Sequence, residues 1–221
     1  IWILIIGLGV LIYVVLDGFD LGIGILFPFI SDRQERDVMM NTVAPVWDGN
    51  ETWMVLGGAG LFAAFPLVYS TVLSALYMPI ILMVIALIFR GVAFEFRFKA
   101  NKTKHLWDQA FIWGSILSSF FQGLILGAYI QGIETTNGIY TGGGLDWLTP
   151  FSLFTGLSVV VLYATLGCGW LIFKTEKMLQ NRMFELMPKL LISLLMIFAC
   201  VSIYTPLAHP QIAERWFSQP Q

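Results

Sequence analysis

Charged residues are scarce in this sequence, and cysteine and histidine are scarcer still. Of its 221 residues only 12% are charged and 57% are hydrophobic, whereas an average globular chain carries about 25% charged residues. This composition argues against a soluble domain and favours a protein whose solvent is the lipid bilayer. With 12 basic and 14 acidic side chains, the chain also lacks the basic surface that nucleic-acid binding requires, so we expect no nucleic-acid partner.

The few cysteines and histidines narrow the chemistry further. Cys168 and Cys200 each lie inside an apolar run, so the sequence holds neither a disulfide framework nor the CxxC spacing of redox and zinc sites. Its two histidines, His105 and His209, both lie at the ends of apolar runs. A membrane cytochrome with histidine pairs in its helices cannot be built from these positions. The sequence therefore predicts no haem and no metal ligated by this chain alone.

The sequence is dominated by long hydrophobic runs. Six runs approach or reach the roughly 20 residues that cross a bilayer as a helix, and they do not alternate polar and apolar faces. Pro66 is expected to end or bend the second run, and Pro79 to kink the third. We predict an all-α integral membrane protein, a single domain over residues 1–221 with about six transmembrane helices, near residues 1–30, 52–69, 72–94, 110–130, 151–173 and 190–207.

Basic residues alternate between the connections that join these runs. The first, third and fifth connections carry lysine and arginine, while the second and fourth carry none. Because basic connections stay in the cytoplasm, both ends of the chain are predicted to lie on the outer side of the membrane. Only Arg215 in the tail departs from this pattern. The first run is too long for a cleaved signal peptide and is expected to be a retained span.

Two aspartates interrupt the first run. A charge at the centre of a bilayer costs about 2.5–3.5 kcal/mol on insertion scales, so each one needs a partner or a function. Asp17 and Asp20 are three residues apart and share one helix face. Gly18 and Gly22 have the small-xxx-small spacing that lets two helices approach closely. Either these carboxylates belong to a packed helix with access to water, or they serve a proton or quinone site.

A second acidic stretch, WDGNETW at residues 47–53, precedes the second run. Asp48 or Asn50 could cap the helix that follows, with Glu51 favoured in its first turn by the helix dipole. Capping does not explain why Trp47 and Trp53 bracket the carboxylates. A functional role for this stretch is therefore favoured, and it is compatible with capping.

The third run ends in Arg90, which lies deeper than Arg97. Snorkelling to the membrane surface would account for Arg90, and a surface pair with Lys99 at i,i+4 spacing would account for Glu95. The predicted topology also brings Glu95 to the same side of the membrane as Asp48. There the two acids could form a carboxylate relay.

Polar side chains also occur along the fourth run. They include Gln122 near its middle, Gln131 at its end, and Ser115, Ser118 and Ser119. Hydrogen bonds between helices are their expected use, because the hydrocarbon offers them no other partner.

Four segments together resemble subunit II of the cytochrome bd-type ubiquinol oxidases. They are DGFDLGIG at residues 17–24, NTVAPVWDGNETW at 41–53, GGAGLFAAFP at 57–66 and FRGVAFEFR at 89–97. The likeness is dense over residues 7–98 and thinner afterwards. It implies that these six spans are the first part of a longer subunit.

The resemblance implies a complex of a bacterial or archaeal plasma membrane that oxidises quinol and reduces dioxygen to water. Such a complex takes its protons from the cytoplasm and contributes to the proton-motive force. Subunit I would carry haem b and haem d, while this chain would stabilise subunit I, help to deliver protons, and hold no cofactor and no complete catalytic site. Membrane lipid and small accessory transmembrane subunits are the other implied partners.

The resemblance also assigns roles to individual residues. The residues that would line a proton pathway are Trp47, Asp48, Trp53 and Glu95. Those that would support the interface facing the haems of subunit I are Asp17, Asp20 and Arg90. Glu95 stands where some relatives have aspartate, which preserves the acid but changes its reach.

An alternative from another class is a secondary transporter that couples Asp17, Asp20 or Asp48 to proton or cation movement. Acids within the membrane and broken helices are typical of such transporters. The sequence lacks an inverted repeat, and its acids cluster on one side, which argues against this alternative. A third interpretation keeps the oxidase partner but gives the carboxylates a purely structural role.

Overall fold

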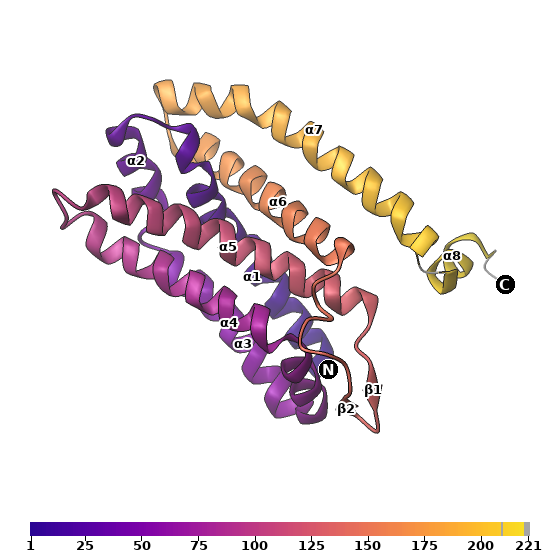
Figure 1. Cartoon of the computed structure of the whole chain (residues 1–221). Coiled ribbons are helices and arrows are strands. Elements are labelled where there is room, and N and C mark those ends of the chain that lie inside the picture. The colour runs from indigo at the N-terminus through magenta and orange to yellow at the C-terminus, as the bar shows by residue number, and fades with distance from the viewer. Residues whose placement is uncertain (209, 219–221) are drawn as a thin grey trace.

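The computed structural model describes residues 1–208 and 210–218, so His209 lies outside the described residues. Helices account for most of the described chain (Figure 1). They are α1 (Trp2–Leu26), α2 (Arg33–Val43), α3 (Trp47–Ala64), α4 (Pro66–Arg97), α5 (Lys104–Gln131), α6 (Pro150–Lys174), α7 (Lys177–Ala208) and α8 (Pro210–Phe217). A 3-10 turn, η1 (Phe27–Phe29), follows α1, and a hairpin of β1 (Thr135–Thr136) and β2 (Ile139–Tyr140) joins α5 to α6.

Five helices of the described chain are long and apolar enough to cross a membrane: α1 with η1, α4, α5, α6 and α7. Each covers most of one predicted span, which confirms the all-α membrane fold. The run near residues 52–69 differs, because it is divided between α3 and α4 at Phe65. Phe65 has non-helical φ and ψ of −139° and 62°. Pro66 then begins a new helix, where its missing N–H leaves no bond unmade.

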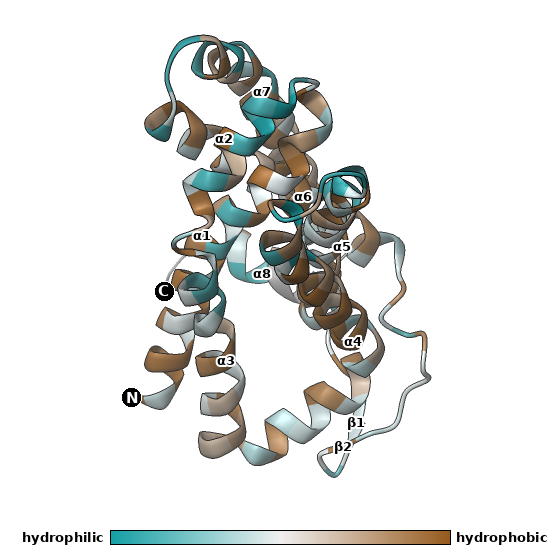
Figure 2. Ribbon diagram, turned by 90° about the vertical axis from the view of Figure 1, so that its left-hand side faces the viewer, coloured by the Kyte–Doolittle hydropathy of each residue, from teal (hydrophilic) through white to brown (hydrophobic). Residues whose placement is uncertain are grey.

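Helix α4 bends near Leu76, whose φ of −117° and ψ of 16° are not helical. Pro79 lies three residues further on and accounts for the bend, since a proline ring inside a helix crowds the preceding turn. The predicted kink is confirmed. The first part of α4 runs across one end of the bundle before the helix turns back along it (Figure 2).

The helices pack in a defined order. Helix α5 lies between α4 and α6, α1 packs on α5 and α6, and α3 packs on α1. Helix α7 lies along α6 at the edge of the bundle (Figure 1). The start of α1, the hairpin and the end of α7 lie toward one end of the molecule, and α2 lies at the other.

Hydrophilic residues gather around α2 and the neighbouring connections (Figure 2). Arg97, at the end of α4, has no exposed surface; it lies 2.6 Å from Asp37 of α2 and also pairs with Asp108 of α5. Arg36 binds Asp108 at 3.1 Å, and Lys104 binds Asp37 at 2.9 Å. These contacts attach α2 to the ends of α4 and α5.

A further ion pair attaches α2 to the next basic connection. Arg182 of α7 lies 2.9 Å from Glu35 of α2. The three connections that carry basic residues therefore meet at one end of the bundle, the α2 end. This is the arrangement that the alternation of basic residues predicts.

Helices α1 and α6 approach so closely that only glycine fits between them. A Cβ atom on Gly22 would overlap the carbonyl oxygen of Tyr163, and one on Gly18 would lie 2.9 Å from the Tyr163 ring. Gly167 of α6 faces Gly22 in the same contact. The predicted close approach at Gly18 and Gly22 is confirmed, and the partner helix is α6.

We expect Gly22→Ala to lower the thermal stability of the protein. The added methyl group meets backbone of α6, which cannot rotate away, and overpacking of this kind costs about 1–3 kcal/mol. Gly58→Ala on α3 is the matched control, because nothing lies within 4 Å of a Cβ atom there. Without a clash, the same change stabilises a helix by about 1 kcal/mol. Thermal unfolding in detergent measures both, and equal shifts would contradict the close approach.

We expect the contribution of Asp37 to stability to be lost in acid. Partial burial alone would raise the pKa of Asp37, but hydrogen bonds from Lys104 and Arg97 lower it below its ordinary value of 3.8. The stabilisation is therefore fully present above pH 3.8 and disappears as the pH falls through the folded-state value. The difference in unfolding temperature between the native protein and Asp37→Asn should shrink on acidification; a growing difference would contradict these pairs.

Candidate functional site

Three of the residues singled out in the sequence meet inside the bundle. Asp17 and Asp20 of α1 and Arg90 of α4 have no exposed surface. Arg90 Nη1 donates a hydrogen bond to Asp17 Oδ1 at 3.0 Å, and Arg90 Nη2 lies 3.9 Å from Asp20 Oδ2. Arg90 thus pairs with the carboxylates of α1 and does not snorkel to the surface.

Helix α3 adds two members to this group. Asn50 Nδ2 donates a hydrogen bond to Asp20 Oδ2 at 2.8 Å. Glu51 Oε2 lies 3.7 Å from Arg90 Nη1. Three helices therefore meet at one group of ionic and polar side chains. We call it the buried ion cluster, composed of Asp17, Asp20, Asn50, Glu51 and Arg90.

The start of α3 differs from the capping predicted for it. The helix begins at Trp47 with Val46 at the N-cap, and no side chain caps it. Asp48 lies in the first turn, and the amide of Asn50 is turned inward to Asp20. Both alternatives for the cap are therefore wrong. Asn50 binds Asp20 instead, because a hydrogen bond to a buried carboxylate is worth more than one to an exposed helix end.

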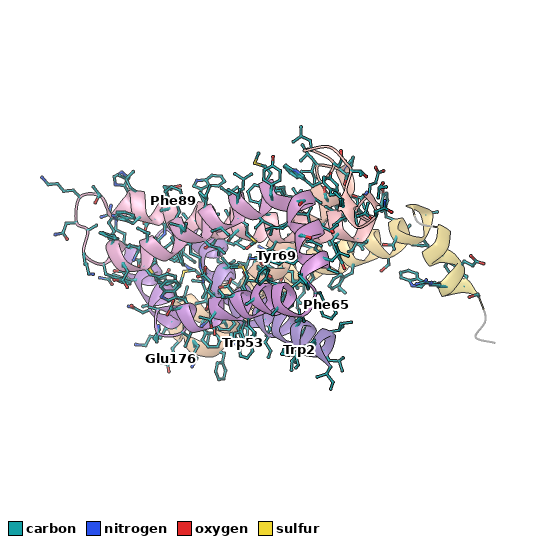
Figure 3. All side chains as sticks on the ribbon, turned by 90° about the horizontal axis from the view of Figure 1, so that it is seen from below. Trp2, Trp53, Phe65, Tyr69, Phe89 and Glu176 are labelled. Carbon is teal, nitrogen blue, oxygen red and sulfur yellow. The ribbon has the colours of Figure 1, made fainter. Side chains whose placement is uncertain are left out.

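Trp47 covers the guanidinium of Arg90. Its ring stacks on Phe94 with centroids 4.8 Å apart and planes at 6°. The Arg90 guanidinium carbon lies 6.0 Å from the Trp47 ring centre and 5.7 Å from that of Phe94, within the range of cation–π attraction. The second predicted tryptophan, Trp53, is half-buried and lies on the same side of the molecule as Trp2 (Figure 3).

A groove of about 320 Å³ opens between α3 and α4 beside the cluster. Its walls are apolar apart from Glu51, whose side chain is 23% exposed while those of the two aspartates are at most 1% exposed. Glu51 is thus the point where the groove reaches the cluster. The lining residues are Trp47, Glu51, Met54, Val84, Leu87, Ile88, Gly91 and Val92.

Two predicted relay residues lie outside the cluster. Asp48 is exposed in the first turn of α3, three residues before Glu51 and therefore on the same side of that helix. Glu95 is exposed on α4 and lies 3.4 Å from Lys99, which confirms the predicted i,i+4 pair. The structure therefore gathers Asp17, Asp20 and Arg90 in the interior and leaves Asp48 and Glu95 at the surface.

A chain of hydrogen bonds lies behind the cluster. The Tyr163 hydroxyl of α6 donates to Gln122 Oε1 of α5 at 2.8 Å, and Gln122 Nε2 donates to the Tyr13 hydroxyl of α1 at 2.7 Å. Tyr13 is four residues before Asp17 and so lies on the same face of α1. The bond expected between helices for Gln122 is confirmed.

The other polar residues of α5 behave differently. The hydroxyls of Ser118 and Ser119 donate to the carbonyl oxygen of Ser115, within the same helix. The Ser115 hydroxyl is buried and has no hydrogen-bond partner in the described chain, so the expectation of bonds between helices is wrong for all three serines. Gln131 Oε1 accepts a hydrogen bond from the Thr149 hydroxyl, at the cap of α6. Serine hydroxyls are short enough to reach the carbonyl oxygens of their own helix, which competes with bonds to a neighbouring helix.

Sequence reasoning missed four members of this region. The sequence favours a functional role for the stretch that holds Asn50 and Glu51, on the evidence of its two tryptophans, but it gives these two residues only helix-start roles. Tyr13 and Tyr163 looked like ordinary apolar residues, and only the spacing of Tyr13 from Asp17 could have indicated the first of them. Across the described ranges 1–208 and 210–218, no group of three His, Cys, Asp or Glu side chains could hold a metal ion.

Comparisons with known proteins agree with these motifs. The sequence matches the protein family described as cytochrome bd terminal oxidase subunit II over residues 1–217. It is 36% identical over 190 residues to cytochrome bd-I ubiquinol oxidase subunit 2 of Escherichia coli (strain K12). It is 35% identical over 189 residues to probable cytochrome oxidase subunit 2 of Haemophilus influenzae, and 34% identical over 197 residues to cytochrome bd ubiquinol oxidase subunit 2 of Bacillus subtilis (strain 168).

The alignments cover most of this chain but only part of each relative. They include 82% of the chain for the E. coli and H. influenzae proteins and 86% for the B. subtilis protein. They include 50%, 50% and 58% of those relatives, respectively. The chain therefore spans about half the length of the curated relatives it matches. Nothing in these comparisons supports the alternative of a secondary transporter.

We expect Arg90→Met to destabilise the protein strongly. It leaves two buried carboxylates without their cation, and breaking a buried pair in this way costs about 3–5 kcal/mol. Lys99→Met, which breaks the exposed pair with Glu95, should change stability little. Adding Asp17→Asn to Arg90→Met should recover part of the loss, because it removes one uncompensated charge. Thermal unfolding in detergent measures all three, and equal effects of the two single variants would contradict the cluster.

Proposed function

The chain belongs to the cytochrome bd terminal oxidase subunit II family, and we propose that it serves as this subunit in a complex that oxidises quinol and reduces dioxygen to water. The family match over residues 1–217 is the observation that carries the proposal. The complex lies in the plasma membrane of a bacterium or archaeon, with both ends of this chain on the outer side. It takes protons from the cytoplasm, so its turnover contributes to the proton-motive force.

The redox chemistry belongs to a partner, subunit I, which holds haem b and haem d and reacts with quinol. This chain stabilises that partner, and accessory transmembrane subunits and lipid cover other faces. The buried ion cluster supports the haem-facing interface by fixing α1, α3 and α4 to one another. The outer face of α4 suits a membrane partner, because Ile88 and Phe89 are 58% and 56% exposed there (Figure 3).

Proton delivery follows Trp47, Asp48, Trp53 and Glu95 along the interface with subunit I. Asp48 lies in the first turn of α3 and Glu95 lies near the end of α4, both at the α2 end of the bundle. The basic connections meet at this end, and the positive-inside rule assigns it to the cytoplasm. Carboxyl groups there can take a proton from water and pass it on. Their exposure in this chain leaves them free to face subunit I.

We expect Asp48→Asn and Glu95→Gln to slow quinol-driven oxygen uptake at least about tenfold, since an amide cannot relay a proton. The haem bands of the complex should persist. The measurement uses the complex purified through a tag on this chain, with a reduced-minus-oxidised spectrum and oxygen uptake recorded on the same sample.

Glu185→Gln is the control, because Glu185 is exposed on α7 and belongs to neither the cluster nor the groove. It should leave oxygen uptake unchanged. Normal turnover in an assembled Asp48→Asn complex would remove the relay role of Asp48. A stable preparation without haem bands would overturn the oxidase assignment itself.

A further inference from the structure

The buried ion cluster contains more acid than base. Asp17 and Asp20 have no exposed surface, and Arg90 is the one cation within 4.0 Å of either in the described chain. If both aspartates were ionised, their two negative charges would face the single positive charge of Arg90. One negative charge would then stay uncompensated in the interior, even before Glu51 is counted. A buried carboxylate avoids that cost by binding a proton.

Two oxygen atoms in the cluster are available for this proton. Asp17 Oδ1 accepts a hydrogen bond from Arg90, and Asp20 Oδ2 accepts one from Asn50. Asp17 Oδ2 and Asp20 Oδ1 are buried and have no hydrogen-bond partner. An acceptor that lacks a donor is costly in the interior, so these two oxygens are where a proton stabilises the cluster most.

The cluster has an entrance on one side. Glu51 lines the groove between α3 and α4, and its carboxylate lies 3.7 Å from Arg90. Asp48, three residues earlier in α3, is exposed at the α2 end. The i,i+3 spacing therefore sets two carboxylates in series along α3, from the surface to the cluster.

The opposite side of the cluster is closed to protons. Gln122 bridges Tyr163 and Tyr13 with hydrogen bonds of 2.8 and 2.7 Å. Its amide donates and accepts hydrogen bonds but does not ionise, so the chain does not carry a proton onward.

We propose that the buried ion cluster is a proton-storage site, loaded from the groove through Glu51 and closed on its far side by Gln122. In the loading step the protonated Glu51 carboxyl gives its proton to an aspartate carboxylate of the cluster, and Glu51 then takes another from water in the groove. Only O–H bonds break and form. The role of this stored proton, which is held beside the proton-delivery path, rests on the proposed function.

The stored proton belongs to the cluster as a whole, since the two aspartates are coupled through one arginine. The titratable and charged groups facing them come from every neighbouring helix. These are Tyr13 from α1, Glu51 from α3, Arg90 from α4 and Tyr163 from α6. Helix α5 contributes only the neutral Gln122 behind the tyrosines.

Infrared spectroscopy of the protein purified in detergent tests the proposal, because a protonated carboxyl has a carbonyl stretch that moves on exchange into heavy water. We expect this band at neutral pH in the native protein. Asp17→Asn and Asp20→Asn should each abolish the same band, since either change leaves one aspartate balanced by Arg90. Loss of the band in only one variant would mean a simple protonated residue and would overturn the shared store.

Glu51→Gln tests the entrance. The band should remain in this variant, but its exchange into heavy water should slow at least about tenfold, the lower end of what a missing acid–base group costs. Glu176→Gln, at the exposed turn between α6 and α7 (Figure 3), is the matched control and should change neither. Unchanged exchange in Glu51→Gln would overturn loading through Glu51.

The native spectrum keeps the test decisive if the aspartate variants do not fold. A native protein without the band at neutral pH holds no stored proton, and the proposal is then wrong. Oxygen uptake on the same samples separates the two proposals. Normal uptake without the band overturns proton storage alone, whereas the band in a protein that binds no haem partner overturns the oxidase function alone.

Discussion

The burial of the Arg90 guanidinium constrains the rest of the bundle. A charge without water or an opposite charge is too costly to keep inside a membrane protein, so carboxylates must reach Arg90 from other helices. Asp17 and Glu51 do so at 3.0 and 3.7 Å. Helices α1, α3 and α4 therefore have to meet at one depth. Their other contacts, including the stacking of Trp47 on Phe94, are compatible with that depth but do not determine it.

Backbone features then decide which spaces are filled and which stay open. Glycine at positions 18 and 22 lets α6 approach α1 until backbone meets backbone, and this brings Tyr163 close to the cluster. On the other side, Pro66 ends α3 and the bend near Leu76 carries α4 away before it returns. The two helices diverge, and the groove beside Glu51 remains. The glycines of α1 thus let α6 cover one side of the cluster, whereas the break at Pro66 and the bend in α4 leave the groove open on the other side.

Much of this organisation could be predicted from the sequence, but the partners within it could not. Run length and hydropathy identify the five long helices, because crossing a bilayer requires length and little else. Spacing along one helix predicts that Asp17 and Asp20 share a face. It cannot predict that Arg90, on a distant helix, forms ion pairs with both aspartates, since this depends on how the helices pack. Asn50 is an example. The sequence predicts that it could cap the exposed start of α3, but in the folded protein it donates a hydrogen bond to the buried carboxylate of Asp20.

Charge balance distinguishes the two ionic networks of this protein. At the α2 end, Arg36, Arg97 and Lys104 meet the carboxylates of Asp37 and Asp108. This end carries a surplus of positive charge beside water, where dissolved ions balance it and the network needs only to hold helices together. The interior cluster has the opposite surplus, because two fully buried aspartates face one guanidinium. Dissolved ions do not reach these two carboxylates. A proton is the one cation small enough to restore neutrality among side chains already in contact. An acid surplus enclosed in this way indicates proton chemistry, whereas the same surplus at a surface would not.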